Sequence, residues 1–422
     1  LGLFGGVKST FNDDDGNIPR ILGQVEELGL ITVDRCFYTQ RNFSFGENLK
    51  RSKLFAHCVY SGVQYELDEK PSFDEFCFQI EGLTQWLGKS GLTQSHSDNL
   101  KTINIQYSKP DSLSFKVDKD CELLIDLGHS LKNDNNTLEL KESSWCSFKT
   151  VDTLPLSYFL SLANKITNFL CFAVDKTVCI ENVSAKSSEL TYDFEGEKVK
   201  QKVKLFYQAV TFADKQSKIY PHEMLFRFFE IEEKFEHVFN RWCTAYEDIT
   251  PSFGLYFAYR QNAHRYLSDS FLALVQGLET MHRRTDNSSE FPINEFEEMV
   301  STLVDACPED KRSWLEGKLK FANEIGLRSR LKELVEPIKK HLGNNKERTS
   351  IINKILVTRN YLTHYSEEFS EQSANGDELY KLVILLEGIF QIHFLNLIGF
   401  NSDEIKSIYE KNYKLRQKLR IG

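Results

Sequence analysis

The stretch KERTSIINKILVTRNYLTHY, residues 346–365, decides how the second half of this chain folds. Its apolar residues recur at helical spacing, which predicts one amphipathic helix. Ile352 and Leu356 lead in four-residue steps to Asn360 and His364, so the apolar stripe turns polar over the last two turns. We therefore expect these two polar side chains to face other helices.

Long amphipathic runs of the same kind fill the chain after Pro221, with almost no β pattern. This change of residue pattern predicts a domain boundary near residues 211–221 and an all-α domain over residues 222–422. Its expected helices span residues 222–247, 253–284, 294–306, 308–324, 329–341, 346–365, 377–398 and 402–419.

The first half of the chain has the opposite pattern. Short β-branched and aromatic runs, several of them alternating with polar residues, indicate an antiparallel sheet with one wet face. We expect strands at residues 28–37, 54–60, 75–80, 102–107, 114–117, 122–127, 137–140, 177–183 and 198–210, and a helix at 155–174. The fold class is therefore α+β, with a β-rich, mostly antiparallel domain at residues 1–215 followed by a helical bundle.

Four lysines, at positions 198, 200, 202 and 204, share one face of the last expected strand. Charged side chains of this kind discourage further strands from pairing at the edge of a sheet, and a row of them is also suited to binding the RNA backbone. We favour the edge strand and keep RNA binding as the alternative.

Composition limits the classes of function. An apolar content of 41% with 13% aromatics suffices for two cores, and the net charge of −9 argues against nonspecific coating of nucleic acid. A local basic site stays compatible with that charge.

Nine scattered cysteines without a Cys-x-x-Cys pair predict reduced thiols in the cytoplasm, not a disulfide framework or a zinc site. The first residues lack the features of a signal peptide, and without an initial Met they leave the natural N-terminus open. Residues 379–400 have the length of a membrane span, but charges at such depth are costly, so we expect a buried helix of a soluble protein. The polar residues that interrupt this stretch are Lys381, Glu387, Gln391, His393 and Asn396.

Arg359 and His364 are suited to cutting RNA without a metal. Histidine moves protons near neutral pH, and the arginine fork holds phosphate oxygens. The ribose 2′-oxygen would attack the neighbouring phosphate, leaving a 2′,3′-cyclic phosphate and a 5′-hydroxyl, and DNA would be inert. An Arg and a His five residues apart also occur by chance, so their context has to decide.

That context resembles the HEPN ribonuclease superfamily. The RNYLTH motif at residues 359–364 lies near the end of a late helix, and an apolar helix follows it. An earlier helix, LALVQGLE at residues 272–279, carries an acidic residue where related HEPN domains have one. GLTQWL at residues 82–87 and the helix at 159–172 resemble the N-terminal domain of ApeA-like anti-phage, or abortive-infection, proteins.

The resemblance implies a helical HEPN domain that forms a homodimer with the two motifs facing one cleft, and cleavage that needs no metal or cofactor. It assigns His364 as acid or base, Arg359 as the phosphate ligand, Asn360 as an orienting group, and Glu279 as a residue that positions Arg or His. The alternatives are a salt bridge between helices for Glu279 and an ordinary core histidine for His364.

Other residues beside the motif have two interpretations each. Arg283 and Arg284, after His282, complement a helix dipole or grip the RNA backbone, and Tyr361 and Tyr365 pack or stack on a base. Four helical histidines lack a partner at metal spacing, so we expect packing and not ligation. They are His264, His282, His341 and His393.

The function implied is that of a defence endoribonuclease whose β-rich domain senses a phage-derived trigger. Similar HEPN toxins often attack tRNA, which makes tRNA the expected substrate class. One alternative is a noncatalytic HEPN module for dimerisation and RNA binding with a ligand-sensing N-terminal domain. Another is that binding of a carbohydrate or a phage protein by the β-rich domain is the main activity.

Overall fold

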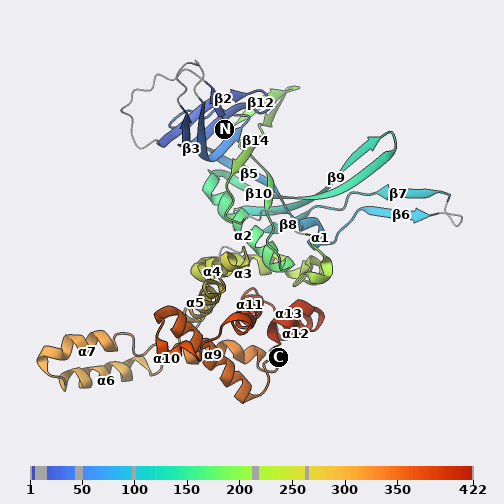
Figure 1. Cartoon of the computed structure of the whole chain (residues 1–422). Helices are drawn as coiled ribbons and strands as arrows, with labels where there is room; N and C mark the ends of the chain where they lie inside the picture. The colour runs from blue at the N-terminus through green and yellow to red at the C-terminus, as the bar shows by residue number, and fades with distance from the viewer. Residues whose placement is uncertain are drawn as a thin grey trace. The chain divides into compact units, whose positions relative to one another are not determined.

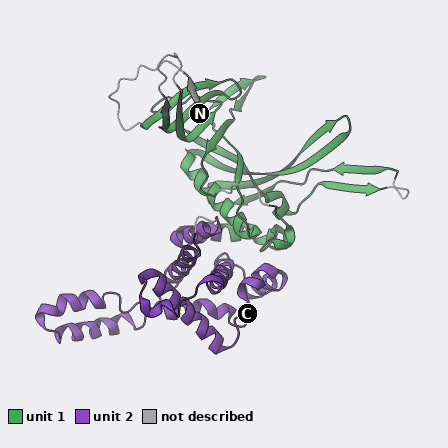
Figure 2. Cartoon of the chain, viewed as in Figure 1, with its two compact units in different colours: residues 1–240 green, residues 241–422 purple. Residues whose placement is uncertain are grey.

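The computed structural model describes residues 2–4, 17–42, 51–96, 101–118, 120–211, 218–261 and 266–420. The chain divides into two compact units, residues 1–240 and 241–422 (Figure 2). The first is built on a β-sheet and the second is helical (Figure 1), which confirms the α+β prediction.

One antiparallel sheet organises the first unit. Its strands run in the order β2-β3-β4-β14-β11-β5-β10-β9-β8, with β1 paired to β4. Their bounds are β1 Gly2–Phe4, β2 Asn17–Val25, β3 Gly29–Asn42, β4 Arg51–Ser61, β5 Ser72–Ile80, β8 Leu113–Lys116, β9 Cys121–Asp134, β10 Thr137–Pro155, β11 Ile180–Lys186 and β14 Val203–Tyr207.

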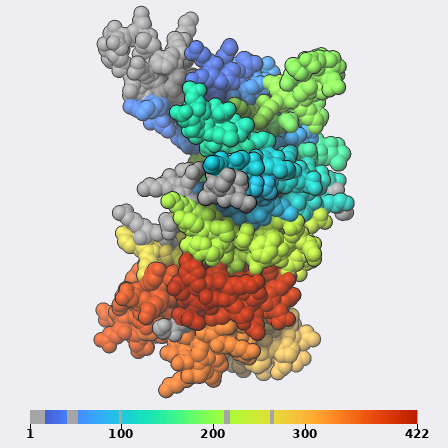
Figure 3. Space-filling view, turned by 90° about the vertical axis from the view of Figure 1, so that its right-hand side faces the viewer, coloured from blue at the N-terminus to red at the C-terminus, as the bar shows by residue number. Residues whose placement is uncertain are grey.

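Three hairpins complete the β structure. The short strands expected at 122–127 and 137–140 are parts of the long β9–β10 hairpin, which pairs without a break from Thr137↔Asp134 to Thr150↔Cys121. Strands β6 (Leu92–His96) and β7 (Ile103–Tyr107) form a second hairpin, and β12 (Thr191–Phe194) and β13 (Glu197–Lys200) a third. The first two hairpins point toward the viewer in Figure 3.

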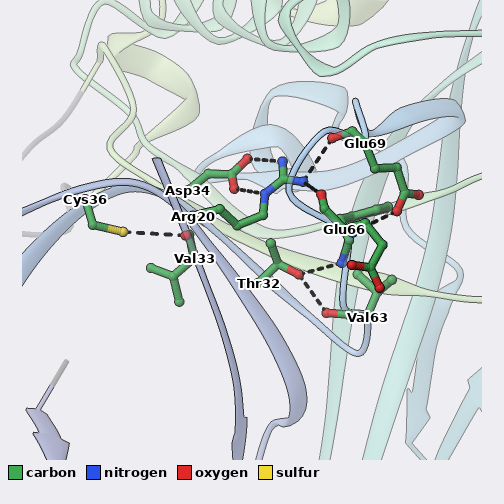
Figure 4. A network of polar contacts seen from close by, with 9 residues as sticks. Arg20, Thr32, Val33, Asp34, Cys36, Val63, Glu66 and Glu69 are labelled. Atoms are coloured by element: carbon green, nitrogen blue, oxygen red, sulfur yellow. Dashed lines mark hydrogen bonds and ion pairs between the residues drawn. The ribbon is translucent and has the colours of Figure 1, made fainter. Parts of the chain in front are cut away.

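A partly buried arginine ties the first two long strands to the loop after β4. Arg20 of β2 forms an ion pair with Asp34 of β3, and its Nη1 donates to the carbonyls of Glu66 and Glu69 (Figure 4). Nearby, the Thr32 hydroxyl donates to the Val63 carbonyl at 3.1 Å. Because each guanidinium nitrogen has an acceptor, the charge of this partly buried arginine is accommodated at the sheet edge.

Helix α2 (Leu156–Val174) packs on the sheet and confirms the helix predicted there. Phe159 stacks on Phe76 of β5, and Phe169 meets Trp86 of the short helix α1 (Leu83–Leu87) edge to face. These rings are fully buried. Aromatic volume therefore builds this core, as the composition indicated.

The first unit extends about 20 residues past the boundary expected at 211–221. Residues 222–234 form short 3-10 turns where a long helix was expected, and regular helix begins only with α3 (Phe235–Asp248). The reason is aromatic packing: Phe228 and Phe235 contact Trp86, whose indole nitrogen donates to the Phe226 carbonyl at 3.0 Å.

The edge strand expected for the lysine-rich segment is confirmed only for its first part, since β13 pairs with β12 alone, and it is wrong for β14, which does not lie at an edge. The chain forms two strands, β13 and β14, and β14 runs inside the sheet between β4 and β11. Val203 and Leu205 are buried while Lys204 is exposed, so one face of β14 is covered. Lys200 of β13 instead reaches Asp74 at 2.7 Å. The alternation of buried and exposed residues along β14, and not its charge, determines where this strand lies.

The second unit contains the predicted helices, several of them divided. Helix 253–284 is two helices, and 402–419 breaks at Asn412, whose side chain caps the next helix. The observed helices are α4 Thr250–Arg260, α5 Leu267–Thr285, α6 Ile293–Asp305, α7 Arg312–Leu319, α8 Leu327–Val335, α9 Asn345–His364, α10 Glu367–Ser370, α11 Gly376–Leu397, α12 Ser402–Lys411 and α13 Tyr413–Leu419.

Helix α11 is the core of this unit, and its buried polar residues, Glu387 and Gln391, are paired. Glu387 is buried, yet it accepts a hydrogen bond from the Tyr259 hydroxyl and forms an ion pair with Arg260. It also accepts a hydrogen bond of 2.9 Å from the Lys418 ammonium group. The same Lys418 also donates to Gln391 at 3.1 Å. Among the described residues, no helix is both long and apolar enough to span a membrane.

Replacing Glu387 should destabilise the second unit strongly. In Glu387→Ala, Arg260 and Lys418 would stay buried without their carboxylate, a loss of about 3–5 kcal/mol in unfolding free energy. Glu378→Ala on the same helix is the matched control, because its pair with Lys354 is exposed and should cost less than about 1 kcal/mol. Urea unfolding measures both, and equal losses would contradict the role of Glu387.

His393 of α11 makes this unit sensitive to acid. Its Nε2 lies 2.8 Å from the Leu334 carbonyl oxygen. Burial lowers the pKa of the imidazole below 6.5; the bond to Leu334 offsets part of this shift, and nearby His282 adds to it. The unfolded chain therefore takes up the proton first as the pH falls. The stability gained from the neutral ring is present above the unfolded pKa of about 6.5 and is lost below it.

A glutamine at this position should flatten that dependence. His393→Gln keeps an N–H donor for the Leu334 carbonyl but cannot titrate, so the variant should lose less stability than the wild type between about pH 7 and pH 5. Urea unfolding at a series of pH values measures the difference. Parallel pH profiles for the two proteins would show that His393 contributes nothing to the acid sensitivity.

Candidate functional site

Helix α9 carries the RNYLTH motif in its last turns. It begins at a capping box, in which the Asn344 side chain accepts from the Glu347 N–H while the Glu347 carboxylate accepts from the Asn344 N–H. It ends at Tyr365, which adopts a left-handed conformation with φ of 50°. The buried residues of the helix are Ile352, Ile355 and Thr358.

The motif faces differently from what the sequence indicated. Asn360 is half-buried and His364 is exposed, whereas we expected both to face other helices. Each four-residue step turns an α-helix by about 40° beyond a full turn, so the line from Ile352 to His364 drifts by roughly 120°. His364 is therefore not an ordinary core histidine in this chain, and among the described residues it has no hydrogen-bond partner.

A surface cavity of about 510 Å³ lies between α5 and α9. One face of α5 forms most of its wall, and Arg359 and Thr363 of α9 form the rest. Six residues of α5 line it: Leu272, Val275, Gln276, Glu279, Thr280 and Arg283. Two of the expected catalytic residues, Arg359 and Glu279, are thus brought together.

The guanidinium of Arg359 is available for a ligand. Within the described part of the chain it has no ion pair, and its one polar contact is a long bond of 3.4 Å to the Asn360 side-chain oxygen. A half-buried arginine without a carboxylate partner beside an open cavity is suited to binding a phosphate. The orienting role of Asn360 stays a prediction, and this contact is compatible with it.

Glu279 pairs within its own helix. Its carboxylate lies 3.5 Å from Arg283, which also reaches Glu324 at 3.0 Å. Glu279 therefore forms no salt bridge between helices among the described residues; Arg283 links it to Glu324, which lies in the loop before α8. Arg283 stays half exposed at the cavity wall, so the cavity has two cations, and carboxylates balance one of them.

The other expected RNA-binding residues lie outside this cavity. Arg284 donates to the Asp248 carbonyl at 2.9 Å and so ties α5 to the end of α3. Tyr361 and Tyr365 contact each other edge to face at 5.6 Å, and Tyr365 is 68% exposed. The structure thus places one arginine of the pair at the cavity and leaves the Tyr365 ring at the surface.

One histidine cluster has the composition of a metal site. His282, Asp286 and Glu333 place ligand atoms within 4.8 Å of one another. However, Arg330, which can only donate, lies 3.1 Å from His282 Nδ1, so the proton of the neutral ring is on Nε2, 2.7 Å from Glu333. The nitrogen that faces the carboxylates then lacks a free lone pair, which fits a structural hydrogen-bond network better than a metal. His264 lies outside the described residues.

Three polar residues of the cavity were not identified from the sequence: Gln276, Thr280 and Thr363. Their positions on the two helices relative to Glu279 and Arg359 are the signal that would have identified them. Gln276 and Thr280 flank Glu279 at steps of three and one, and Thr363 is four residues after Arg359, where its hydroxyl donates to the Arg359 carbonyl at 2.7 Å.

Comparison with known families yields two matches. The family ApeA N-terminal domain 1 matches residues 1–242, and the family Apea-like HEPN matches residues 272–404. The end of the first match lies close to the end of the first compact unit at residue 240. No curated protein and no solved structure matches the chain.

The second match contains every residue of the cavity between α5 and α9. HEPN domains are generally ribonucleases that bind RNA and typically dimerise, so the match supports a nuclease-type role in defence against phage. The first match covers more than half of the 422 residues. The chain therefore belongs to the ApeA-like family of HEPN proteins.

Proposed function

We propose that this protein is an anti-phage endoribonuclease that cleaves cellular RNA without a metal, with tRNA as the expected substrate class. The observation that carries the proposal is the place of Arg359 at the edge of an open cavity, in a helix that ends in His364, with no carboxylate partner among the residues that the structure describes. An RNA phosphate would be the negatively charged partner that this guanidinium lacks among the described residues.

The proposed reaction uses the RNA's own 2′-hydroxyl. Its oxygen attacks the adjacent phosphorus, the bond to the 5′-oxygen breaks, and the products are a 2′,3′-cyclic phosphate and a 5′-hydroxyl. Arg359 stabilises the extra negative charge on the phosphate oxygens, and His364 moves the proton on or off the reacting oxygens. Asn360 contacts this arginine, and Glu279, on the opposite wall of the same cavity, is assigned to positioning Arg359 or His364.

Two chains would complete the site. Within one chain, the residues that line the cavity include Arg359 but not His364, which lies on an exposed side of α9 about 140° farther round the helix. A homodimer in which the two motifs face each other would add histidines to a cleft that already has arginines. The N-terminal domain would then control the enzyme by recognising a phage-derived trigger.

The alternative is a noncatalytic HEPN module that dimerises and holds RNA. It predicts RNA binding without new ends. The two functions differ in one observable, the chemistry of the RNA termini after incubation.

Cleavage should depend on His364 and not on metal. Purified protein incubated with total bacterial RNA in EDTA should generate fragments with 5′-hydroxyl ends, and His364→Ala should lower the rate by at least about a hundredfold. His237→Ala is the matched control, because His237 is likewise an exposed helical histidine. End mapping and gel analysis measure both.

Two outcomes would count against the proposal. Equal cutting by wild type and His364→Ala would remove His364 from the mechanism, and RNA that is bound but uncut would favour the noncatalytic module. A dilution series tests the shared site in the same assay, because specific activity should fall once dilution separates the two chains.

A further inference from the structure

The central sheet of the first unit is split between β11 and β14. These strands pair only at Ser184↔Lys204 and Ala185↔Val203; beyond this point β14 follows β4 and β11 follows β5. The register of β11 against β5 also shifts between Glu181 and Ser184, where Asn182 has a φ of 52°. A bulge of this kind bends a strand and opens space beside it.

A cavity of about 1020 Å³ occupies the split. Residues 179–184 of the β11 segment and 204–209 of the β14 segment line it, together with Trp145 of β10. Its volume is at the top of the range for small-molecule sites, roughly 300–1,000 Å³. The cavity lies wholly in the N-terminal unit and shares no residue with the cavity of the HEPN domain.

Two lysines give this cavity its charge. Lys202 and Lys204 both line it, and among the described residues neither has an ion pair. Neighbouring lysines differ, since Lys186 pairs with Glu75 and Lys200 with Asp74. The Lys202 and Lys204 ammonium groups therefore lack an anionic partner that the fold could have supplied.

Aromatic rings lie next to these cations. The Lys202 ammonium is 5.9 Å from the centre of the Trp145 ring, and Phe206 of β14 is 49% exposed. The cavity thus has a cationic end with an aromatic wall.

We propose that this cavity binds a nucleotide, with its phosphates on Lys202 and Lys204 and its base against Trp145. A free inorganic anion would leave the rings and most of the volume uncovered. An apolar ligand would bury two ammonium groups without a counter-charge, which is costly. A phosphate joined to a flat ring satisfies the lysines and the indole together.

Calorimetric titration of the full chain with ATP, GTP, CTP and UTP, each in EDTA, tests the proposal. At least one should bind saturably, one molecule per chain, and more tightly than its nucleoside or inorganic triphosphate. The double variant Lys202→Gln/Lys204→Gln should bind that nucleotide roughly ten-fold or more weakly, and Trp145→Leu should also weaken it.

Lys198→Gln is the matched control, since Lys198 belongs to the same run of lysines but does not line the cavity, and its affinity should equal that of the wild type. Thermal unfolding checks that each variant is folded; the lysines are exposed, so their replacement should leave the fold intact.

Three results would overturn the proposal: no saturable binding of any of the four nucleotides, unchanged affinity in the double lysine variant, or equal binding of inorganic triphosphate. The last would mean an anion site only. Because the readout is binding and not RNA cleavage, the result is independent of whether His364 acts in catalysis.

Discussion

The close approach of α5 to α11 fixes the geometry on which the HEPN cavity depends. Gly277 makes it possible, because a Cβ there would lie 2.7 Å from the Phe390 ring and 3.4 Å from the Leu255 Cβ. The Ser252 hydroxyl also donates to the Gly277 carbonyl at 2.6 Å. With this side of α5 packed, its opposite side must face outward, and Glu279 and Arg283 become the wall of the cavity that Arg359 borders.

Much of the fold could be predicted from the sequence. The helices of the second unit follow from apolar spacing and caps, and the antiparallel character of the first follows from alternation. The order of strands could not be predicted, since β14 lies between β4 and β11 through long-range pairing that leaves no local signal. The boundary between the two units could not be predicted either, because the packing of Phe228 and Phe235 on Trp86 joins residues far apart in the chain.

The candidate site was predictable in its residues and less so in its arrangement. The motif and its acidic partner identified Arg359 and Glu279, which the fold brings to one cavity. The orientation of His364 was missed, because four-residue steps drift round a helix and a single chain does not show what faces its exposed side. The roles of Arg283 and Arg284 separate only in three dimensions, where one lines the cavity and the other binds the Asp248 carbonyl.

In the proposed mechanism the RNA supplies its own nucleophile while Arg359 and His364 supply charge and protons. A single 2′-deoxy substitution at the nucleotide before a mapped cleavage point tests this mechanism. We expect cleavage at that phosphate to be abolished while the modified RNA still binds with unchanged affinity and is cut at other sites. Cleavage at the deoxy linkage at the original rate would contradict it, because the attacking oxygen would have to come from elsewhere.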